Sequence, residues 1–205
     1  MAGSGPTGAE RFIQGILPDN PVYRQLLGMC PTLAVTAAMK PAVTMACATG
    51  FVLICANLIV SLVRGLLKPH LRILIFTLTI ATFVTIADRI LQAYVYDMSK
   101  VLGPYVPLII VNCMIICRCE VCASKQSVGV AFMDALGIFL GFLLALASVA
   151  TVREILGSGT WFGKQVMPEG WPGWGVMVLA PGAFLTLGLL LGLVNWLGTL
   201  KKGEE

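Results

Sequence analysis

The longest apolar run in the chain, residues 128–152, constrains the fold most strongly. Asp134 is its only charged residue, and the run exceeds the roughly 20 residues that a helix needs to cross a bilayer. The whole chain of 205 residues agrees with this, because 58% of it is hydrophobic and only 12% is charged, whereas soluble domains carry about 25% charged residues. We therefore predict an all-α integral membrane protein that contacts the lipid bilayer.

Six apolar segments divide the chain. We expect six transmembrane helices in a single domain over residues 21–200, preceded by a cytoplasmic lead-in at 1–20 and followed by a cytoplasmic tail at 201–205. The segments are 22–38, 41–63, 71–91, 105–125, 128–152 and 176–197.

Two of these segments are short or broken, and each carries a cysteine. In segment 22–38, Pro31 removes a backbone hydrogen bond beside Cys30. In segment 105–125, charges begin well before a full span is complete, and Cys113 lies in the apolar part. Paired interrupted segments are a strong sequence indication of a functional centre near the membrane midplane. The sequence therefore predicts that Cys30 and Cys113 belong to this functional centre.

The six segments form two groups of three, residues 21–100 and 101–200. Because three is an odd number, the second group runs inverted relative to the first. Each group has a short cysteine segment, a long segment that ends at an arginine (Arg64 or Arg153), and a third segment. We predict two inverted three-helix repeats, each with a short, broken first helix.

The distribution of positive charge predicts the orientation. When Lys and Arg residues are counted on alternate sides, nine of the 14 fall on the side of the loop between the second and third segments. Cytoplasmic loops carry the excess of Lys and Arg in membrane proteins. We therefore expect a multi-pass protein with both termini in the cytoplasm.

The other cysteines do not complete a metal site by themselves. In a regular helix, Cys113 and Cys117 share one face, whereas Cys119 and Cys122 lie roughly opposite, so these four thiols cannot surround one cluster. The predicted two-fold relation between the halves would instead bring Cys30 and Cys113 together at the membrane midplane. Because iron-sulfur clusters and tetrahedral zinc sites take four ligands, such a site would need two more ligands from another chain. The alternative is that both cysteines pack as small hydrophobic residues in a helix interface.

Two carboxylates are candidates for an ion path. Asp88 lies near the end of the third segment and Asp134 lies early in the fifth. Ionisable groups inside a membrane are costly and are usually functional. The alternative is that both sit at headgroup depth and face water, and Asp88 is adjacent to Arg89. We interpret the sequence Arg153-Glu154 as an ion pair at a helix end.

Composition and motifs disfavour several classes of function. His70 is the only histidine, so a Ser/His/Asp catalytic set would have to use that residue. Hydrolytic catalysis by this chain is therefore disfavoured. The sequence has no nucleotide or flavin motif, and it offers no basic surface for nucleic acid. An inverted repeat with broken segments also fits a secondary transporter, and a purely structural protein whose cysteines pack is a further alternative.

Four stretches resemble one family of membrane subunits. They are NPVYRQLLGMCPTLAVT at 20–36, PLIIVNCMIICRCEVCASK at 107–125, VREILGSGTWFG at 152–163 and APGAFLTLGLLLG at 180–192. The chain resembles the membrane component shared by two complexes: the E subunit of the Rnf electron-transport complex (RnfE) and the D subunit of the sodium-pumping NADH:quinone oxidoreductase (NqrD). The sequence GPYVPLIIVNC at 103–113 looks more like the Rnf member.

The resemblance implies a non-catalytic electron-transfer subunit in the prokaryotic inner membrane. In the family, a homologous partner of opposite topology, the A subunit in Rnf (RnfA), contributes two cysteines to a [2Fe-2S] cluster, and the RnfE-type chain contributes the other two. Matched by motif, those iron ligands fall on Cys30 and Cys113. Other subunits carry flavins and iron-sulfur clusters, and electron flow between ferredoxin or NADH and these flavins is coupled to Na⁺ or H⁺ transport.

The chain departs from the family at one place. Where the family usually reads GRAEAFA, this chain reads CRCEVCA at 117–123. Cys117, Cys119 and Cys122 therefore replace small or aromatic residues. We interpret them as packing residues, with an accessory thiol role as the alternative.

Overall fold

The computed structural model describes residues 11–13, 15, 19–66, 69–166 and 173–202. Within them, three helices are long and apolar enough to cross a membrane, namely α3 (Met39–Val63), α4 (Arg72–Tyr94) and α8 (Val128–Ser158). The all-α membrane class is thereby confirmed. Predicted segments 41–63 and 71–91 match α3 and α4 closely, and α8 continues beyond the predicted end of its segment.

A bent segment supplies a fourth candidate span. Helix α5 (Tyr96–Leu102) meets the stretch Pro107–Ala123 at an angle of 68°. That stretch contains three short elements in succession, α6 (Pro107–Ile110), α7 (Cys113–Arg118) and the π-helix η3 (Cys119–Ala123). The predicted interruption of this segment is confirmed, and the break lies directly before Cys113.

The first predicted segment is helical in its second half only. Helix α2 spans Met29–Val35, and turns lead into it from Asn20. Both Leu26 and Gly28 adopt positive φ angles, a conformation that a helix cannot continue through. The segment is therefore a half-helix, too short to cross the membrane alone.

The sixth predicted segment is divided as well. A short helix α9 (Gly175–Val178) precedes α10 (Ala180–Lys202), and Leu179 between them is extended. The prediction of one continuous helix over 176–197 is therefore wrong. Pro181 explains the break, because proline is tolerated in the first turn of a helix and disrupts its interior. The remaining short elements are η1 (Arg64–Leu66), η2 (Pro69–Leu71) and a hairpin of β1 (Thr160–Trp161) and β2 (Lys164–Gln165).

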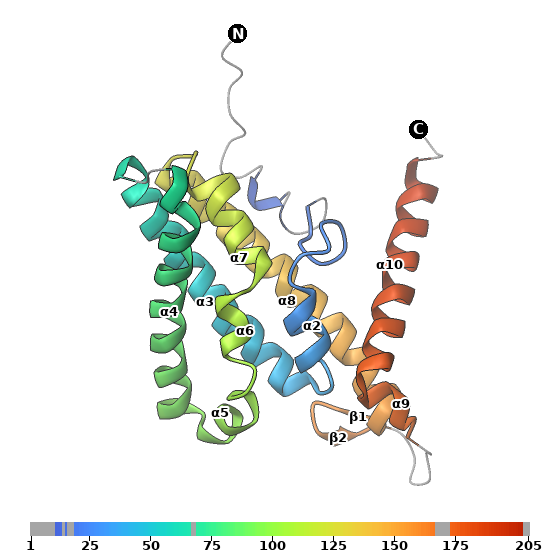
Figure 1. Ribbon diagram of the computed structural model, residues 1–205. Coiled ribbons are helices and arrows are strands. Elements are labelled where there is room, and N and C mark those ends of the chain that lie inside the picture. The colour runs from blue at the N-terminus through green and yellow to red at the C-terminus, as the bar shows by residue number, and fades with distance from the viewer. Residues whose placement is uncertain (1–10, 14, 16–18, 67–68, 167–172, 203–205) are drawn as a thin grey trace.

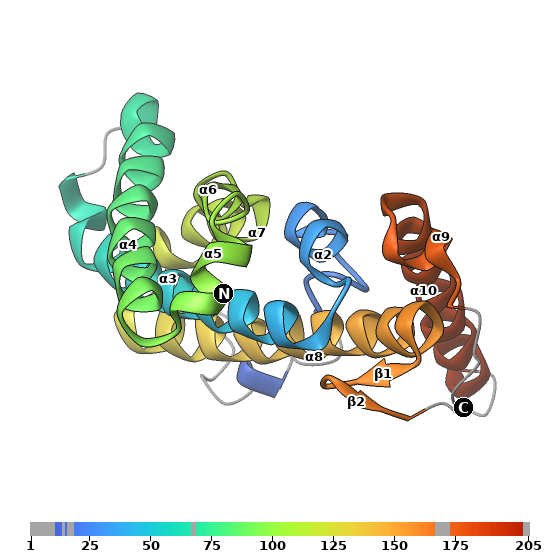
Figure 2. The same ribbon diagram turned by 90° about the horizontal axis from the view of Figure 1, so that it is seen from below.

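Helices α3 and α8 form the centre of the molecule and make the most extensive helix–helix contact. Figure 2 shows α8 running along the length of the protein, with α4, α7 and α2 on one side of it and α10 at its far end. Large buried side chains fill the space between these helices, and they include Met45, Leu53, Phe76, Ile115 and Phe142.

The face of α8 that carries Gly137 and Gly141 receives the start of the chain. A Cβ atom placed on Gly137 would lie 2.6 Å from the carbonyl oxygen of Phe12, and one on Gly141 would collide with the carbonyl of Gly15. Asn20 donates from Nδ2 to the carbonyl of Gly141 at 3.0 Å. Where it is described, the lead-in therefore packs against α8, on the side away from α2 (Figure 2).

Candidate functional site

The two cysteine-bearing breaks meet inside the molecule. The backbone N–H of Gly28, which caps the start of α2, donates to Sγ of Cys113 at 3.2 Å. Cys30 is the second residue of α2, and Cys113 is the first residue of α7. In Figure 1 the two helices run in opposite directions from this point, so their N-terminal ends face each other. The structure thus joins the two segments that the sequence marks.

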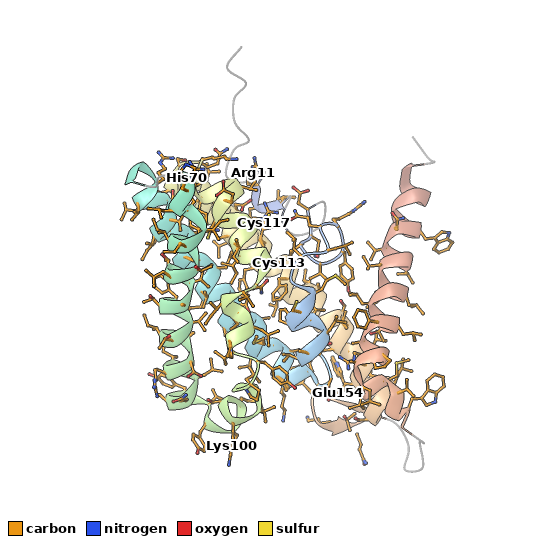
Figure 3. The ribbon with its side chains drawn as sticks, in the orientation of Figure 1. Arg11, His70, Lys100, Cys113, Cys117 and Glu154 are labelled. Atoms are coloured by element: carbon orange, nitrogen blue, oxygen red, sulfur yellow. The ribbon has the colours of Figure 1, made fainter. Side chains whose placement is uncertain are left out.

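The meeting point lies between the two edges of the molecule. Figure 3 places Cys113 between an edge marked by Arg11 and His70 and an opposite edge marked by Lys100 and Glu154. Both Cys30 and Cys113 are exposed on the surface of this chain. The two thiols are therefore accessible to a neighbouring molecule at this depth.

Asn112 fixes the start of α7. Its Oδ1 atom accepts the backbone N–H of Met114 at 3.0 Å, a side-chain cap that satisfies one of the free amides of the first turn. Asn112 is 2% exposed, and its Nδ2 atom has no hydrogen-bond partner among the described residues. A Cβ atom on Gly28 would lie 3.6 Å from Asn112 Oδ1. An unused donor is thus buried beside the contact between the two breaks.

An apolar cleft of about 770 Å³ opens beside Cys113. Cys117 lines the same cleft, which agrees with the prediction that these two thiols share one helix face. At its margin, Arg72 and Glu120 form an ion pair with 3.3 Å between Nη1 and Oε1. The rest of the lining is Leu27, Ile73, Phe76, Val111, Ile116 and Val121.

The thiols of Cys119 and Cys122 are placed differently. Both are buried, neither lines the cleft, and Cys119 donates from Sγ to Oδ1 of Asn57 on α3 at 3.3 Å. Their separation from Cys113 and Cys117 agrees with the prediction, although the helix there is a π-helix rather than an α-helix. Cys119 therefore belongs to the packing between α3 and η3, whereas Cys122 interacts with Asp134 on α8.

Two thiols could supply half of the ligands of an iron-sulfur cluster. Across the described residues, no group of three or more His, Cys, Asp or Glu side chains is arranged to hold a metal ion. Iron-sulfur clusters are held by Cys thiolates, four for a [2Fe-2S] cluster. Cys30 and Cys113 fit two of these positions, with the Gly28 N–H already directed at one sulfur.

Comparison with known proteins identifies the family. The family model described as Rnf-Nqr subunit, membrane protein, matches residues 9–191. The chain belongs to the Rnf-Nqr family. The resemblance seen in the four sequence stretches is thereby confirmed.

Curated relatives cover most of this Rnf-Nqr protein. The chain is 44% identical over 187 residues to the E subunit of the Na⁺-translocating ferredoxin:NAD⁺ oxidoreductase complex of Acetobacterium woodii, covering 91% of this chain and 95% of the relative. It is 41% identical to the E subunit of the ion-translocating oxidoreductase complex of Methanosarcina acetivorans, with 91% and 90% covered. It is 43% identical to the D subunit of the Na⁺-translocating NADH-quinone reductase of Aeromonas hydrophila, with 86% of each covered.

The two carboxylates predicted for an ion path lie apart in the Rnf-Nqr protein. Asp134 is 2% exposed, and its Oδ1 atom lies 3.5 Å from Nη1 of Arg118. Its Oδ2 atom and the Nε and Nη2 atoms of Arg118 have no partner among the described residues. The alternative that Asp134 faces water is therefore wrong. Asp88, in the last third of α4, is partly exposed and accepts a hydrogen bond from Gln92 at 2.8 Å.

Sequence reasoning missed the role of Arg153 and Glu154. The predicted ion pair between them is absent from the ion pairs of the described residues. Instead, Arg153 donates to backbone carbonyls of other elements, and Glu154 accepts the backbone N–H of Met39 at 2.7 Å. The signal was available in the sequence, because two adjacent opposite charges on a helix point in different directions and do not face each other.

Proposed function

We propose that this Rnf-Nqr protein is the membrane component of an ion-translocating oxidoreductase complex of the ferredoxin:NAD⁺ type. It carries single electrons across the membrane through a [2Fe-2S] cluster held by Cys30, Cys113 and two cysteines of a homologous partner. The observation that carries the proposal is the 3.2 Å contact from the Gly28 N–H to the Cys113 sulfur. It joins the two breaks, and both thiols are exposed beside it.

The chain's own residues suit a negatively charged sulfur site. The N-terminal ends of α2 and α7 both point at the meeting place, and helix N-termini favour negative charge. The Gly28 N–H donates to one sulfur, and the unpartnered Nδ2 of Asn112 is a second donor of the same kind. Hydrogen bonds to sulfur and burial tune the reduction potential of such clusters. The bound cluster supplies one-electron oxidation and reduction.

A paired arrangement of arginines supports the inverted repeat. Arg64, at the end of α3, donates to the carbonyl of Gln126, just after the short cysteine segment of the second half, at 2.5 Å. Arg153, near the end of α8, donates to the carbonyl of Leu33 in the short cysteine helix of the first half at 3.4 Å. Each half thus braces the other half's short segment. We infer six membrane crossings in two inverted halves, 21–100 and 101–200.

The same arrangement supports an orientation. Figure 3 places Arg11 and His70 at one edge, and α10 ends at that edge in Figure 1. Arg64 follows the end of α3, Arg72 begins α4 and Arg118 ends α7, and these three helix ends lie at the same edge in Figure 1. Following the excess of positive charge in cytoplasmic loops, we infer that this edge faces the cytoplasm of a prokaryotic cell and that both termini lie there.

The partner is inferred from the incomplete ligand set. Two exposed thiols on one surface need two more ligands, and a homologous chain of opposite topology, of the RnfA type, would present its own pair at the same depth. The relatives are named as subunits of larger complexes. We infer that flavin- and iron-sulfur-bearing subunits of such a complex exchange electrons with this site.

Membership of the sodium-pumping NADH:quinone oxidoreductase is the second candidate function. It is favoured by the 43% identity to the D subunit from Aeromonas hydrophila. The two candidates differ in the reaction of the purified complex. Reduction of NAD⁺ by reduced ferredoxin supports the first, and reduction of a quinone by NADH supports the second.

An ion path through the carboxylates is a separate part of the proposal. Asp134 is buried against Arg118 and retains an unpartnered oxygen among the described residues, whereas Asp88 is partly exposed. Asp134→Asn should therefore reduce ion transport more than Asp88→Asn. Ion uptake into vesicles, measured together with electron transfer for each variant, tests this. Equal transport in both variants and the unchanged protein would remove these residues from the path.

The deciding experiment compares three single variants of the purified complex. Electron paramagnetic resonance, with iron and sulfide analysis, is measured for Cys30→Ser, Cys113→Ser and Cys117→Ser. We expect Cys30→Ser and Cys113→Ser to lose one [2Fe-2S] signal and electron transfer, and Cys117→Ser to keep both. An unchanged spectrum in an assembled Cys113→Ser complex would reject the shared cluster and favour a transporter without iron.

A further inference from the structure

Arg153 occupies an unusual position near the end of α8. It is only 2% exposed and ranks among the largest fully buried side chains of the described residues. Each of its five N–H groups has one acceptor, so its hydrogen-bonding capacity is completely used. Nε donates to Met177 O at 3.0 Å, Nη1 to Thr36 Oγ1 at 2.7 Å and Leu33 O at 3.4 Å, and Nη2 to Val178 O at 3.0 Å and Leu179 O at 3.3 Å.

These acceptors are the C-terminal ends of two short helices. At the end of α2 the acceptors are the Leu33 carbonyl and the Thr36 hydroxyl, and at the end of α9 they are three backbone carbonyls. The last carbonyls of a helix have no partner within the helix and carry a partial negative charge. In a membrane interior each unsatisfied carbonyl is costly. Arg153 therefore supplies both the hydrogen bonds and the positive charge that these two helix ends need.

Glu154, the neighbour of Arg153 on α8, binds the start of α3. Its Oε2 atom accepts the N–H of Met39, the first residue of α3, at 2.7 Å. Its Oε1 atom accepts the N–H of Gly163 at 3.2 Å. The end of α2 and the start of α3 are thus both held by adjacent residues of α8, with Glu154 at the molecular edge labelled in Figure 3.

The opposite end of α2 carries the candidate site. Helix α2 has seven residues, which gives it a length of about 10 Å. Its first end presents Gly28, whose N–H contacts the Cys113 sulfur, and Cys30. Because a helix this short moves as one body, a displacement of its Arg153-bound end alters the position of Cys30 and the N–H to sulfur contact.

We propose that Arg153 is a positioning residue for the sulfur site: by anchoring the C-terminal end of α2, it fixes Cys30 and the Gly28 N–H relative to Cys113. The inference rests on the proposed cluster function and adds a residue that does not touch the cluster. Loosening the anchor weakens the Gly28 N–H donation to sulfur. Because such donation stabilises the more negative, reduced form of a cluster, its loss lowers the reduction potential.

The test uses Arg153→Lys in the purified complex. Lysine keeps the positive charge but presents three donors from one point, so it cannot serve five acceptors on two helix ends. We expect an assembled complex with unchanged iron content, a lower midpoint potential of the [2Fe-2S] signal and electron transfer slowed several-fold. Arg89→Lys is the matched control, because Arg89 is exposed and donates to Gln92 on its own helix. An unchanged potential in the assembled Arg153→Lys complex overturns the inference.

A second variant covers a failure of Arg153→Lys to assemble. Thr36→Val removes the 2.7 Å acceptor of Arg153, together with the hydroxyl's own donation to the Thr32 carbonyl, and preserves the shape of a fully buried side chain. It should lower the potential in the same direction by a smaller amount. If Arg153→Lys does not assemble and the Thr36→Val complex has the same midpoint potential as the unchanged complex, the result counts against the inference.

Alkylation of Cys30, measured after removal of iron, tests this inference separately from the proposed function. In chelator-treated complex, alkylation of Cys30 by a membrane-permeant maleimide should be several-fold faster in Arg153→Lys, with Cys117 unchanged. Faster alkylation combined with no cluster signal in the unchanged complex would reject the cluster and retain the anchoring role of Arg153. Equal alkylation combined with a signal that Cys113→Ser abolishes would reject the anchoring role and retain the cluster.

Discussion

The two cysteine-bearing breaks reach similar positions by different means. At Cys113 the helix start is capped by a side chain one residue away, Asn112. At Cys30 there is no side-chain cap, and the chain turns into the helix through Gly28 at φ 74°. The break at Cys113 is therefore determined by neighbouring residues of the sequence. The break at Cys30 depends on a backbone conformation that favours glycine and on contacts from distant parts of the chain.

Gly28→Ala should have the largest effect, because it changes the break at Cys30, which has no side-chain cap. An alanine at positive φ costs about 1–2 kcal/mol, and its Cβ would also lie 3.0 Å from Cε2 of Phe142. We expect a lower melting temperature in detergent and loss of the cluster signal. Gly129→Ala on α8 is the control, because no atom lies within 4 Å of a Cβ there. Equal melting of the two variants would contradict the comparison.

Gly141→Ala should have the next largest effect, because it tests the remote support of the break at Cys30. The added Cβ would collide with the carbonyl of Gly15 and lie 3.4 Å from Nδ2 of Asn20, which binds the Gly141 carbonyl. Overpacking of this kind costs about 1–3 kcal/mol. Thermal unfolding should show the loss. In Gly141→Ala, the rate of maleimide labelling should increase more at Cys30 than at Cys113. A larger increase at Cys113 would disprove the dependence of the Cys30 break on α8.

Asn112 variants separate the capping of α7 from donation to sulfur. Asn112→Ala removes the acceptor of the Met114 N–H, at a cost of about 1 kcal/mol for a lost cap. Asn112→Asp keeps an acceptor there but removes the unpartnered Nδ2 donor and adds negative charge. We expect near-normal thermal stability for Asn112→Asp, together with a lower midpoint potential. A normal potential in Asn112→Asp would show that Nδ2 does not face the sulfur.

Cys119→Ala should have the smallest effect. It removes the hydrogen bond from the Cys119 thiol to Asn57, and a neutral hydrogen bond contributes about 1 kcal/mol. The thiol lies away from the cleft beside Cys113, so the cluster signal should stay unchanged. A changed spectrum in this variant would give Cys119 the accessory role that its packing position argues against.

The sequence predicts the spanning helices and the marked cysteines for a clear physical reason. Burial in lipid requires long apolar runs, so α3 and α4 are evident within a few residues of their ends. Interrupted runs at Cys30 and Cys113 are evident for the same reason. The meeting of the two breaks was predicted only from the two-fold relation between the halves. The Gly28 to Cys113 contact itself is not evident from any local pattern, because it joins residues 85 positions apart.

The hydrogen bonds around Arg153 could not be predicted from hydrophobic periodicity. A hydrophobic pattern reports which face of a helix is buried, but it does not report which carbonyls lack a partner. Arg153 and Glu154 have opposite charges and are adjacent, but neighbouring side chains on a helix do not face each other, so the helical spacing argues against the predicted ion pair. The breaks at Val35 and Val178 create free carbonyls that attract Arg153 instead. The Pro181 signal for the second of these breaks was present in the sequence.

The Arg153 anchor also has a consequence for biogenesis. Its contacts to Leu33 and Thr36 span 120 and 117 residues of sequence. At a synthesis rate of about 5–20 residues per second, α2 waits on the order of ten seconds for the residue that caps its end. Helix α2 is therefore made early and completed late, so insertion order and folding order differ in this protein.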